Sequence, residues 1–161
     1  MKTNKLASYR AKELGFTLVE LVVTMAIVII LVVSAIAILD PVRQFAQGRN
    51  TQRKANLNVI LGAIGQNLSD NKGTFSCSSG AVPTTTKRMA SVATSTNYNI
   101  APCLVTTYLN SLPYDPSTSS AHWASVSDYD TGYTILQDAT SGHITVSAPA
   151  AELSSTISYT R

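Results

Sequence analysis

One acidic side chain stands inside a long apolar stretch near the start of the chain. Residues 16–39 are apolar apart from Thr17, Glu20, Thr24 and Ser34. A carboxylate inside a membrane-spanning helix costs on the order of 3 kcal/mol, and such groups usually serve a function. The chemistry open to Glu20 is ion pairing with a nearby cation.

The stretch around Glu20 has the length of a membrane span. At about 1.5 Å per residue, residues 16–39 form a helix of about 36 Å, which is enough to cross a bilayer core. Residues 1–15 carry four basic side chains against one acidic side chain, Glu13. Because basic residues favour the cytoplasmic side, we expect a single-pass protein of the cytoplasmic (inner) membrane with its N-terminus in the cytoplasm.

The junction between the basic segment and the apolar stretch has a distinctive order. It reads KELGFTLVEL from Lys12 to Leu21. This order resembles the prepilin signature of type IV pilins and type II secretion pseudopilins. In that signature a short basic leader ends in Gly, Phe follows, and a Glu stands fifth after the cut. The resemblance is strong over residues 12–40, weaker over residues 41–70 and nearly absent in detail beyond them.

The resemblance implies a cleavage, a modification and an assembly. A prepilin peptidase would cut after Gly15, and the new N-terminal residue, Phe16, would be N-methylated. The α-amino group released there is largely protonated at neutral pH. Glu20 lies one helical turn away and would pair with its own amine or with that of a neighbour. Such pairing would guide subunits into a homo-oligomeric helical filament, extracted from the membrane by an ATP-driven pilus or secretion assembly machine.

Other interpretations compete with this one. An ordinary signal peptide fits poorly, because its apolar region is usually about 7–15 residues and ends at small residues, which Leu39-Asp40-Pro41 does not offer. A plain single-span anchor fits the basic N-terminal side equally well but does not explain Glu20. For Glu20 itself, the alternatives are snorkelling to the nearby interface or a favourable interaction with the helix dipole.

Two cysteines, Cys77 and Cys103, follow the apolar stretch. If that region lies outside the cytoplasm, we expect them to form a disulfide. A bridge over about 27 residues would stabilise the fold by roughly 3–4 kcal/mol on the chain-entropy model. The resembling family often carries a disulfide, but commonly nearer the C-terminus. Two unpaired thiols are the alternative, and two cysteines without further ligands do not predict a metal site.

Three aspartates, Asp115, Asp128 and Asp130, flank a segment rich in tyrosine and serine. The region is similar to one in which some secretion pseudopilins bind calcium through oxygen ligands, so these carboxylates are calcium candidates. We favour the simpler interpretation that they are solvated turn residues, and we expect no cofactor.

No pattern in the sequence predicts an enzyme. His122 and His143 have no suggestively placed Ser, Asp or Cys, and the chain has no glycine-rich phosphate loop and no His/Glu metal motif. The net charge of +3 arises from the first 15 residues, so the remainder is formally neutral. Without a dense basic patch in that remainder, direct nucleic-acid binding is not expected.

The segments that must position these residues divide the chain into four expected parts. Residues 1–15 are the leader, 16–39 the membrane and polymerisation helix, 40–72 an amphipathic helical half, and 73–161 a small β-rich head domain. Pro41 predicts a kink. Within 40–72, apolar residues recur at three- and four-residue spacings, and five should face a sheet: Leu57, Ile60, Leu61, Ile64 and Leu68.

The head is predicted to be a small antiparallel sheet. Residues 74–112 have the composition of a loop with little regular structure. Residues 129–147 favour a strand pair with a turn at 138–142, and residues 122–126 favour a third strand. The predicted fold class is therefore α+β: a long N-terminal helix whose apolar first half projects alone and whose second half packs on the sheet.

These features predict a structural subunit of a type IV pilus-like extracellular filament, stored in the membrane until its leader is cut. The closest rival is a periplasmic or cell-envelope pseudopilin of a type II secretion or DNA-uptake system. A rival of another class is an anchored domain that binds a ligand or adhesion target and never polymerises. Glu20 and the Gly15-Phe16 junction separate filament from anchor, whereas no feature separates pilus from pseudopilus or a major from a minor subunit.

Overall fold

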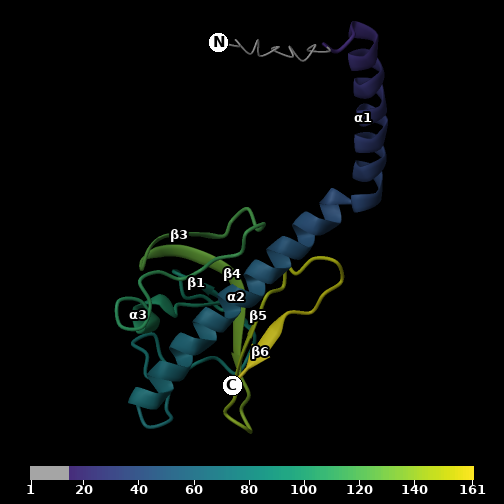
Figure 1. Cartoon of the computed structure of the whole chain (residues 1–161). Helices are drawn as coiled ribbons and strands as arrows, with labels where there is room; N and C mark the ends of the chain where they lie inside the picture. Colours follow the sequence, from purple (N-terminus) through teal and green to yellow (C-terminus); the bar gives the residue numbers. More distant parts are fainter. Residues whose placement is uncertain (1–14) are drawn as a thin grey trace, which may run out of the picture. The chain divides into compact units, whose positions relative to one another are not determined.

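The computed structural model describes residues 15–161, apart from the side chains of residues 37 and 39 (Figure 1). Most of the predicted leader therefore lies outside the described residues. The chain divides into two compact units, Met1–Pro41 and Val42–Arg161. Among the described residues, the first contains one apolar helix. The second, which we call the head from here on, contains a helix, a sheet and their common core.

The apolar stretch forms helix α1, Leu18–Leu39. Asp40 then adopts a left-handed conformation with φ 41°, and helix α2 begins at Pro41. A proline is well suited to the first position of a helix, because its missing N–H would have no partner there. The predicted interruption at Pro41 is confirmed.

Helix α2, Pro41–Asp70, supplies one wall of the core. The side chains of Leu57, Ile60 and Ile64 are fully buried, Leu61 is buried, and Leu68 is partly buried against the same cluster. The helix stops where Lys72 and Gly73 take positive φ angles. The N–H of Gly73 donates to the carbonyl of Leu68 at 2.7 Å, which closes the last turn. The predicted apolar face is thus confirmed.

The sheet is built around one long strand, β4, and Figure 1 shows α2 lying across it. The strand order is β2-β1-β4-β5-β6, with β3 also paired to β4. The α+β class is confirmed, but the sheet is mixed rather than purely antiparallel, because β1 and β2 run parallel. The strands are β1 Lys87–Ala90, β2 Asn97–Tyr98, β3 His122–Ser125, β4 Asp128–Gln137, β5 Ile144–Ser147 and β6 Ser158–Thr160.

Residues 74–112 are more ordered than the sequence predicts. They contain β1, β2 and the short helix α3, Ala101–Leu104. The expectation of a loop is wrong here because these elements have only two to four residues each and show no usable periodicity. Their order comes from burial instead: Met89, Ile100 and Leu104 are completely inaccessible to solvent.

Strand β4 alternates as a half-buried strand should. Tyr129, Tyr133 and Ile135 point into the core, while Asp128 is exposed. The hydroxyl of Tyr129 accepts hydrogen bonds from the N–H groups of Ile100 and Ala101 at 2.9 and 3.1 Å. This tyrosine therefore ties α3 to the sheet and satisfies donors that burial would otherwise leave unpaired.

A buried ion pair joins α2 to the loop before β3. The Arg53 guanidinium donates to the Asp115 carboxylate at 2.7 Å, and both side chains are inaccessible to solvent. Gly132 lies directly over Asp115, because a Cβ on Gly132 would come within 2.9 Å of the aspartate Cβ. A buried arginine is tolerable only when its charge is paired and its donors are used.

The remaining donors of Arg53 are also used. One nitrogen donates to Glu152 at 2.9 Å and to Asn50 at 2.7 Å, and another donates to the hydroxyl of Ser117. Arg49 in turn holds the Glu152 carboxylate with two hydrogen bonds. We call Arg49, Asn50, Arg53, Asp115 and Glu152 the arginine cluster. No buried side-chain nitrogen or oxygen within residues 15–161 lacks a hydrogen-bond partner.

The arginine cluster shifts the ionisation of both its acids. Burial alone would raise the pKa of Asp115, but hydrogen bonds from Arg53 and from the N–H groups of Ser117 and Thr118 lower it to about 2. Hydrogen bonds from Arg49 and then Arg53 lower the pKa of Glu152 to about 2. Both acids are therefore ionised at neutral pH and stabilise the folded state there.

Because the folded pKa of Asp115 lies below its ordinary value of 3.8, its contribution is present at neutral pH and is lost as the pH falls from about 4 towards 2. Arg53→Met leaves Asp115 buried without a cation, so we expect a loss of about 3–5 kcal/mol in the free energy of unfolding at pH 7. Denaturant titration of the detergent-solubilised chain, followed by near-ultraviolet circular dichroism, measures both effects.

Lys54→Met is the matched control, because Lys54 neighbours Arg53 on α2 but is exposed. It should change the free energy of unfolding by no more than about 0.5 kcal/mol. The double variant Arg53→Met/Asp115→Leu should recover part of the loss, since no charge is then left buried and unpaired. Equal losses in Arg53→Met and Lys54→Met would contradict a structural role for the buried pair.

Candidate functional site

The predicted cleavage junction lies at the start of α1. Apart from the chain neighbours of Gly15, no heavy atom of the described residues lies within 4 Å of the place where its Cβ would stand. Phe16 is 83% exposed. Thr17 caps the helix, and its hydroxyl oxygen accepts the backbone N–H of Glu20 at 3.2 Å. On the described side the junction is thus sterically open, and the threonine hydroxyl satisfies one of the first helical N–H groups.

Glu20 lies in the first turn of α1 and is exposed. Within the described part of the chain, its carboxylate makes no ion pair and no hydrogen bond. The other polar groups of the helix are satisfied internally, since the hydroxyl of Thr24 donates to the carbonyl of Leu21 and that of Ser34 to the carbonyl of Ile30. Of the polar side chains in α1, Glu20 therefore keeps its hydrogen-bonding capacity for a partner elsewhere.

Helix α1 is apolar around its whole circumference. Within residues 15–161, one helix is long and apolar enough to cross a membrane, with a window at Leu18–Ile36 of mean hydropathy 2.8 and no buried residue. An apolar surface of this extent is typical of a segment that contacts lipid or other protein. The predicted membrane helix is present as a continuous element.

A disulfide joins Cys77 and Cys103, the pairing that the sequence predicts. Their Cα atoms are 4.9 Å apart. The bond connects the segment that follows α2 to helix α3. Beside it, Asn67 of α2 donates to the carbonyl of Ser76 and accepts the N–H of the same residue. Covalent and hydrogen bonds thus both hold this segment against the core.

The three calcium candidates have separate partners. Asp115 belongs to the arginine cluster, Asp130 pairs with Arg88 at 2.6 Å, and Asp128 lies 3.1 Å from the imidazole of His122. Within the described residues, no three His, Cys, Asp or Glu side chains come together as a potential metal group. The expectation of a solvated turn residue is wrong for Asp115, which is buried because an arginine lies directly beside it.

The imidazole of His122 is held at the surface of β3. The pKa of His122 is raised by its hydrogen bond to the carbonyl of Ser120 and by its contact with the Asp128 carboxylate. Its Nδ1 lies 2.8 Å from that carbonyl, so this nitrogen carries the proton. Both ring nitrogens of His122 therefore have partners at the surface of the head.

Comparison with known proteins identifies the start of the chain. Residues 10–38 match the family model described as the prokaryotic N-terminal methylation motif. This motif marks prepilins of the type IV pilin and pseudopilin kind. The start of the chain is prepilin-like. No curated protein and no solved structure matches it significantly.

For this prepilin-like chain, the motif and the apolar helix fit a type IV pilin-like or pseudopilin subunit. They imply processing by a prepilin peptidase, assembly into pilus-like filaments and anchoring in a membrane before assembly. The motif covers Gly15, Phe16 and Glu20 and ends before α2. It therefore carries no information about the head.

The arginine cluster was not predicted from the sequence, although a signal for it exists. The buried positions of α2 continue backwards from Leu57 at helical spacing through Arg53, Asn50 and Ala46. A polar residue on the extended apolar stripe of a helix has to be buried together with a partner. The residue type conceals this signal, because an arginine on a helix is usually solvated.

The disulfide predicts that both thiols are blocked in the native prepilin-like chain. Alkylation before reduction should add nothing to the mass, and alkylation after reduction should add two groups, since the chain has two cysteines. Replacing both cysteines by alanine should lower the free energy of unfolding by about 3 kcal/mol. Alkylation of the native protein without a reductant would show that packing alone holds this segment.

Proposed function

We propose that this chain is a structural subunit of a type IV pilus-like filament that is cut after Gly15 and assembled through α1. The observation that carries the proposal is the exposed carboxylate of Glu20, which has no partner within residues 15–161. It lies in the first turn of an otherwise apolar helix that begins directly after the Gly15-Phe16 junction. The role is structural rather than enzymatic, and it requires no cofactor.

Cleavage after Gly15 creates the partner that Glu20 lacks. Hydrolysis of the peptide bond leaves a protonated α-amino group on Phe16, four residues before the carboxylate. An unpaired carboxylate in the bilayer is costly, and pairing with an ammonium offsets that cost. The amine of an incoming neighbour can provide the same compensation. N-methylation of Phe16 leaves the positive charge in place.

The remainder of α1 suits both the stored and the assembled state. In the membrane its side chains contact lipid tails, and in a filament they contact equivalent helices. Both environments are apolar, so transfer from one to the other does not expose the helix to water. Extraction of α1 from the membrane requires a pilus or secretion assembly machine. This machine and the prepilin peptidase are the two partners that we propose for the chain.

A pseudopilin of a secretion or DNA-uptake system would use the same junction and the same helix. A non-polymerising anchor has no use for a carboxylate at Glu20, since an apolar residue would insert more favourably. The discriminating observation is therefore what happens when that carboxylate is removed.

Gly15→Val should block processing and leave the precursor in the membrane. The structure has room for a side chain at Gly15, so loss of cleavage would arise at the peptidase rather than from misfolding. Gly48→Ala is the control, because that exposed glycine of α2 is equally open and lies outside the junction. Mass spectrometry of the membrane and filament fractions should show wild-type chains that begin at Phe16. A mature chain that begins elsewhere would contradict the proposal.

Glu20→Ala and Glu20→Gln should accumulate as leader-cleaved membrane monomers with few or no filaments. Removing a charge from the span makes insertion easier, so membrane levels should not fall. Glutamine keeps the size of the side chain but cannot neutralise an ammonium, so both variants should lose filaments alike. Immunoblots of sheared and membrane fractions measure the distribution.

Glu13→Ala is the matched control for these variants, because Glu13 belongs to the predicted leader and is removed by cleavage. It should leave the sheared fraction unchanged. Normal filament yield from Glu20→Ala cells would show that the carboxylate is not needed for assembly and would favour the anchor interpretation.

A further inference from the structure

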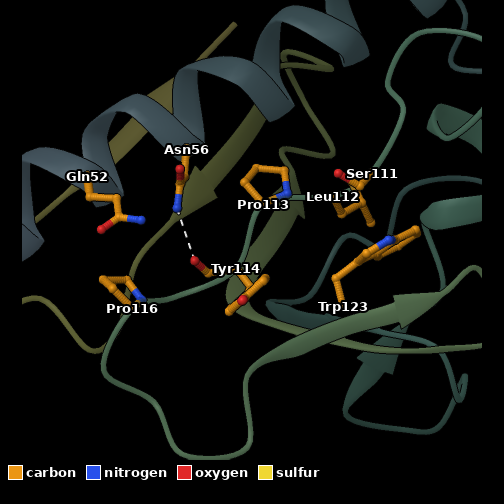
Figure 2. A pocket seen from close by; sticks show the side chains of 8 residues that line it. All are labelled: Gln52, Asn56, Ser111, Leu112, Pro113, Tyr114, Pro116 and Trp123. Carbon is orange, nitrogen blue, oxygen red and sulfur yellow. Dashed lines mark hydrogen bonds between the residues drawn. The ribbon is translucent and has the colours of Figure 1, made fainter.

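An open groove lies on the surface of the head between α2 and the loop that precedes β3. Its volume is about 460 Å³, within the range of small-molecule sites. Figure 2 shows the side chains that line it: Gln52, Asn56, Ser111, Leu112, Pro113, Tyr114, Pro116 and Trp123. We call it the Trp123 groove, and the prepilin motif does not reach it.

No charged side chain lines the Trp123 groove. Two charged residues, Arg53 and Asp115, are next in sequence to lining residues, but their side chains are buried and paired with each other. A nucleic acid or another polyanion would meet no cation in the lining, and its affinity depends on such contacts. The groove is therefore suited to a neutral ligand.

Flat apolar rings make up much of the lining. The indole of Trp123 is half-buried and rests against Tyr129, with ring centroids 5.5 Å apart. Tyr114 is 45% exposed, and the rings of Pro113 and Pro116 flank it. Exposed aromatic faces of this kind bind flat apolar surfaces with little loss of conformational entropy.

Uncommitted polar groups lie beside these rings. Gln52 is exposed, and neither its amide nor the hydroxyls of Ser111 and Tyr114 make a hydrogen bond within the described residues. Asn56, one helical turn from Gln52, has a fixed amide because its nitrogen donates to the Tyr114 carbonyl at 3.0 Å and to the Tyr133 hydroxyl at 2.9 Å. This anchoring holds the loop against α2 before any ligand arrives.

The lining loop offers no strand edge to an extended peptide. The carbonyl of Tyr114 is already bound to Asn56, and the N–H of Asp115 donates to the carbonyl of Thr131 at 2.8 Å. Strand addition depends on free backbone groups of this kind. Because these two groups are occupied, we expect a ligand of the Trp123 groove to contact side chains, namely aromatic faces together with amide and hydroxyl groups.

We propose that the Trp123 groove binds a neutral carbohydrate. A sugar ring presents an apolar C–H face and a rim of hydroxyls in one rigid unit. The face would stack on Trp123 or Tyr114, and the hydroxyls would bond to Gln52 and Ser111. This inference concerns the head alone and does not depend on polymerisation, so it can fail while the proposed filament function holds, and the reverse is equally true.

The chain carries its own reporter for this proposal, since Trp123 is its one tryptophan. The full chain is purified in a zwitterionic detergent, because a maltoside or glucoside would itself present sugar to the groove. Lactose, chitotriose and cellotriose are titrated while tryptophan emission is recorded. At least one should produce a saturable change, with a dissociation constant of about 1 mM, as expected for an open groove with few contacts.

Matched ligands and variants make the result specific. Sialyllactose adds a negative charge to lactose and should bind no better than lactose, because the lining has no cation. Gln52→Ala and Tyr114→Ala keep the reporter and should weaken binding about tenfold. Gln66→Ala, an equivalent change at an exposed position elsewhere on α2, should leave binding unchanged. Near-ultraviolet circular dichroism verifies that each variant is folded.

The proposal is overturned if no saccharide changes the emission, or if Gln66→Ala weakens binding as much as Gln52→Ala. It is also overturned if an Ala-Pro-Pro-Ala-Pro peptide saturates the signal and the sugars do not, since the groove would then recognise proline-rich chains. Saccharide binding that Gln52→Ala abolishes and Gln66→Ala preserves would establish the site, whatever the effect of Tyr114→Ala on folding.

Discussion

An apolar helix of this length has to be kept out of water throughout the life of the protein. Every described side chain of α1 is exposed in the isolated chain, including residues as large as Leu31 and Ile36. Its backbone needs no external partner, because a helix satisfies its own hydrogen bonds. Its side chains do need an apolar partner, and lipid tails or other apolar helices can provide that partner. The proposed membrane storage and the proposed filament assembly would each meet this requirement.

The same requirement explains why the head has its own core. A head that used α1 to complete its core would lose part of that core whenever α1 entered a membrane or a filament. Instead, α2 supplies the helical layer of the core with Leu57, Ile60 and Ile64. The arginine cluster fixes α2 to two loops much later in the sequence, those that contain Asp115 and Glu152. The stability of the head is thereby separated from the environment of α1.

Sequence reasoning succeeded where a segment was long and periodic. The apolar run of α1, the stripe of α2 and the alternation in β4 and β5 each repeat a pattern often enough to specify the element. It failed for β1, β2 and α3, whose few residues are ordered by contacts with distant parts of the chain. The antiparallel pairing of Lys87 with Ile135 is one such contact, and the local propensity of either segment does not reveal it.

The same division applies to the functional residues. The junction and Glu20 were recognisable because their meaning depends on order along the chain. The arginine cluster was not, because Arg53 and Asp115 are 62 residues apart and each alone resembles a solvated surface residue. The Trp123 groove likewise combines residues of α2, a loop and β3. Because these segments are separated in the sequence, the sequence alone could not predict that their residues line one groove.

The first turn of α1 shows how Glu20 can be available for assembly at all. A glutamate at the third position of a helix often serves its own helix, by bonding back to the N-cap residue. Here the hydroxyl of Thr17 caps the backbone N–H of Glu20, while the Glu20 carboxylate forms no hydrogen bond within the described residues. The start of the helix is thus secured by threonine. The Glu20 carboxylate is therefore available to pair with a cation. If the chain is cut after Gly15, the new α-amino group of Phe16 is such a cation.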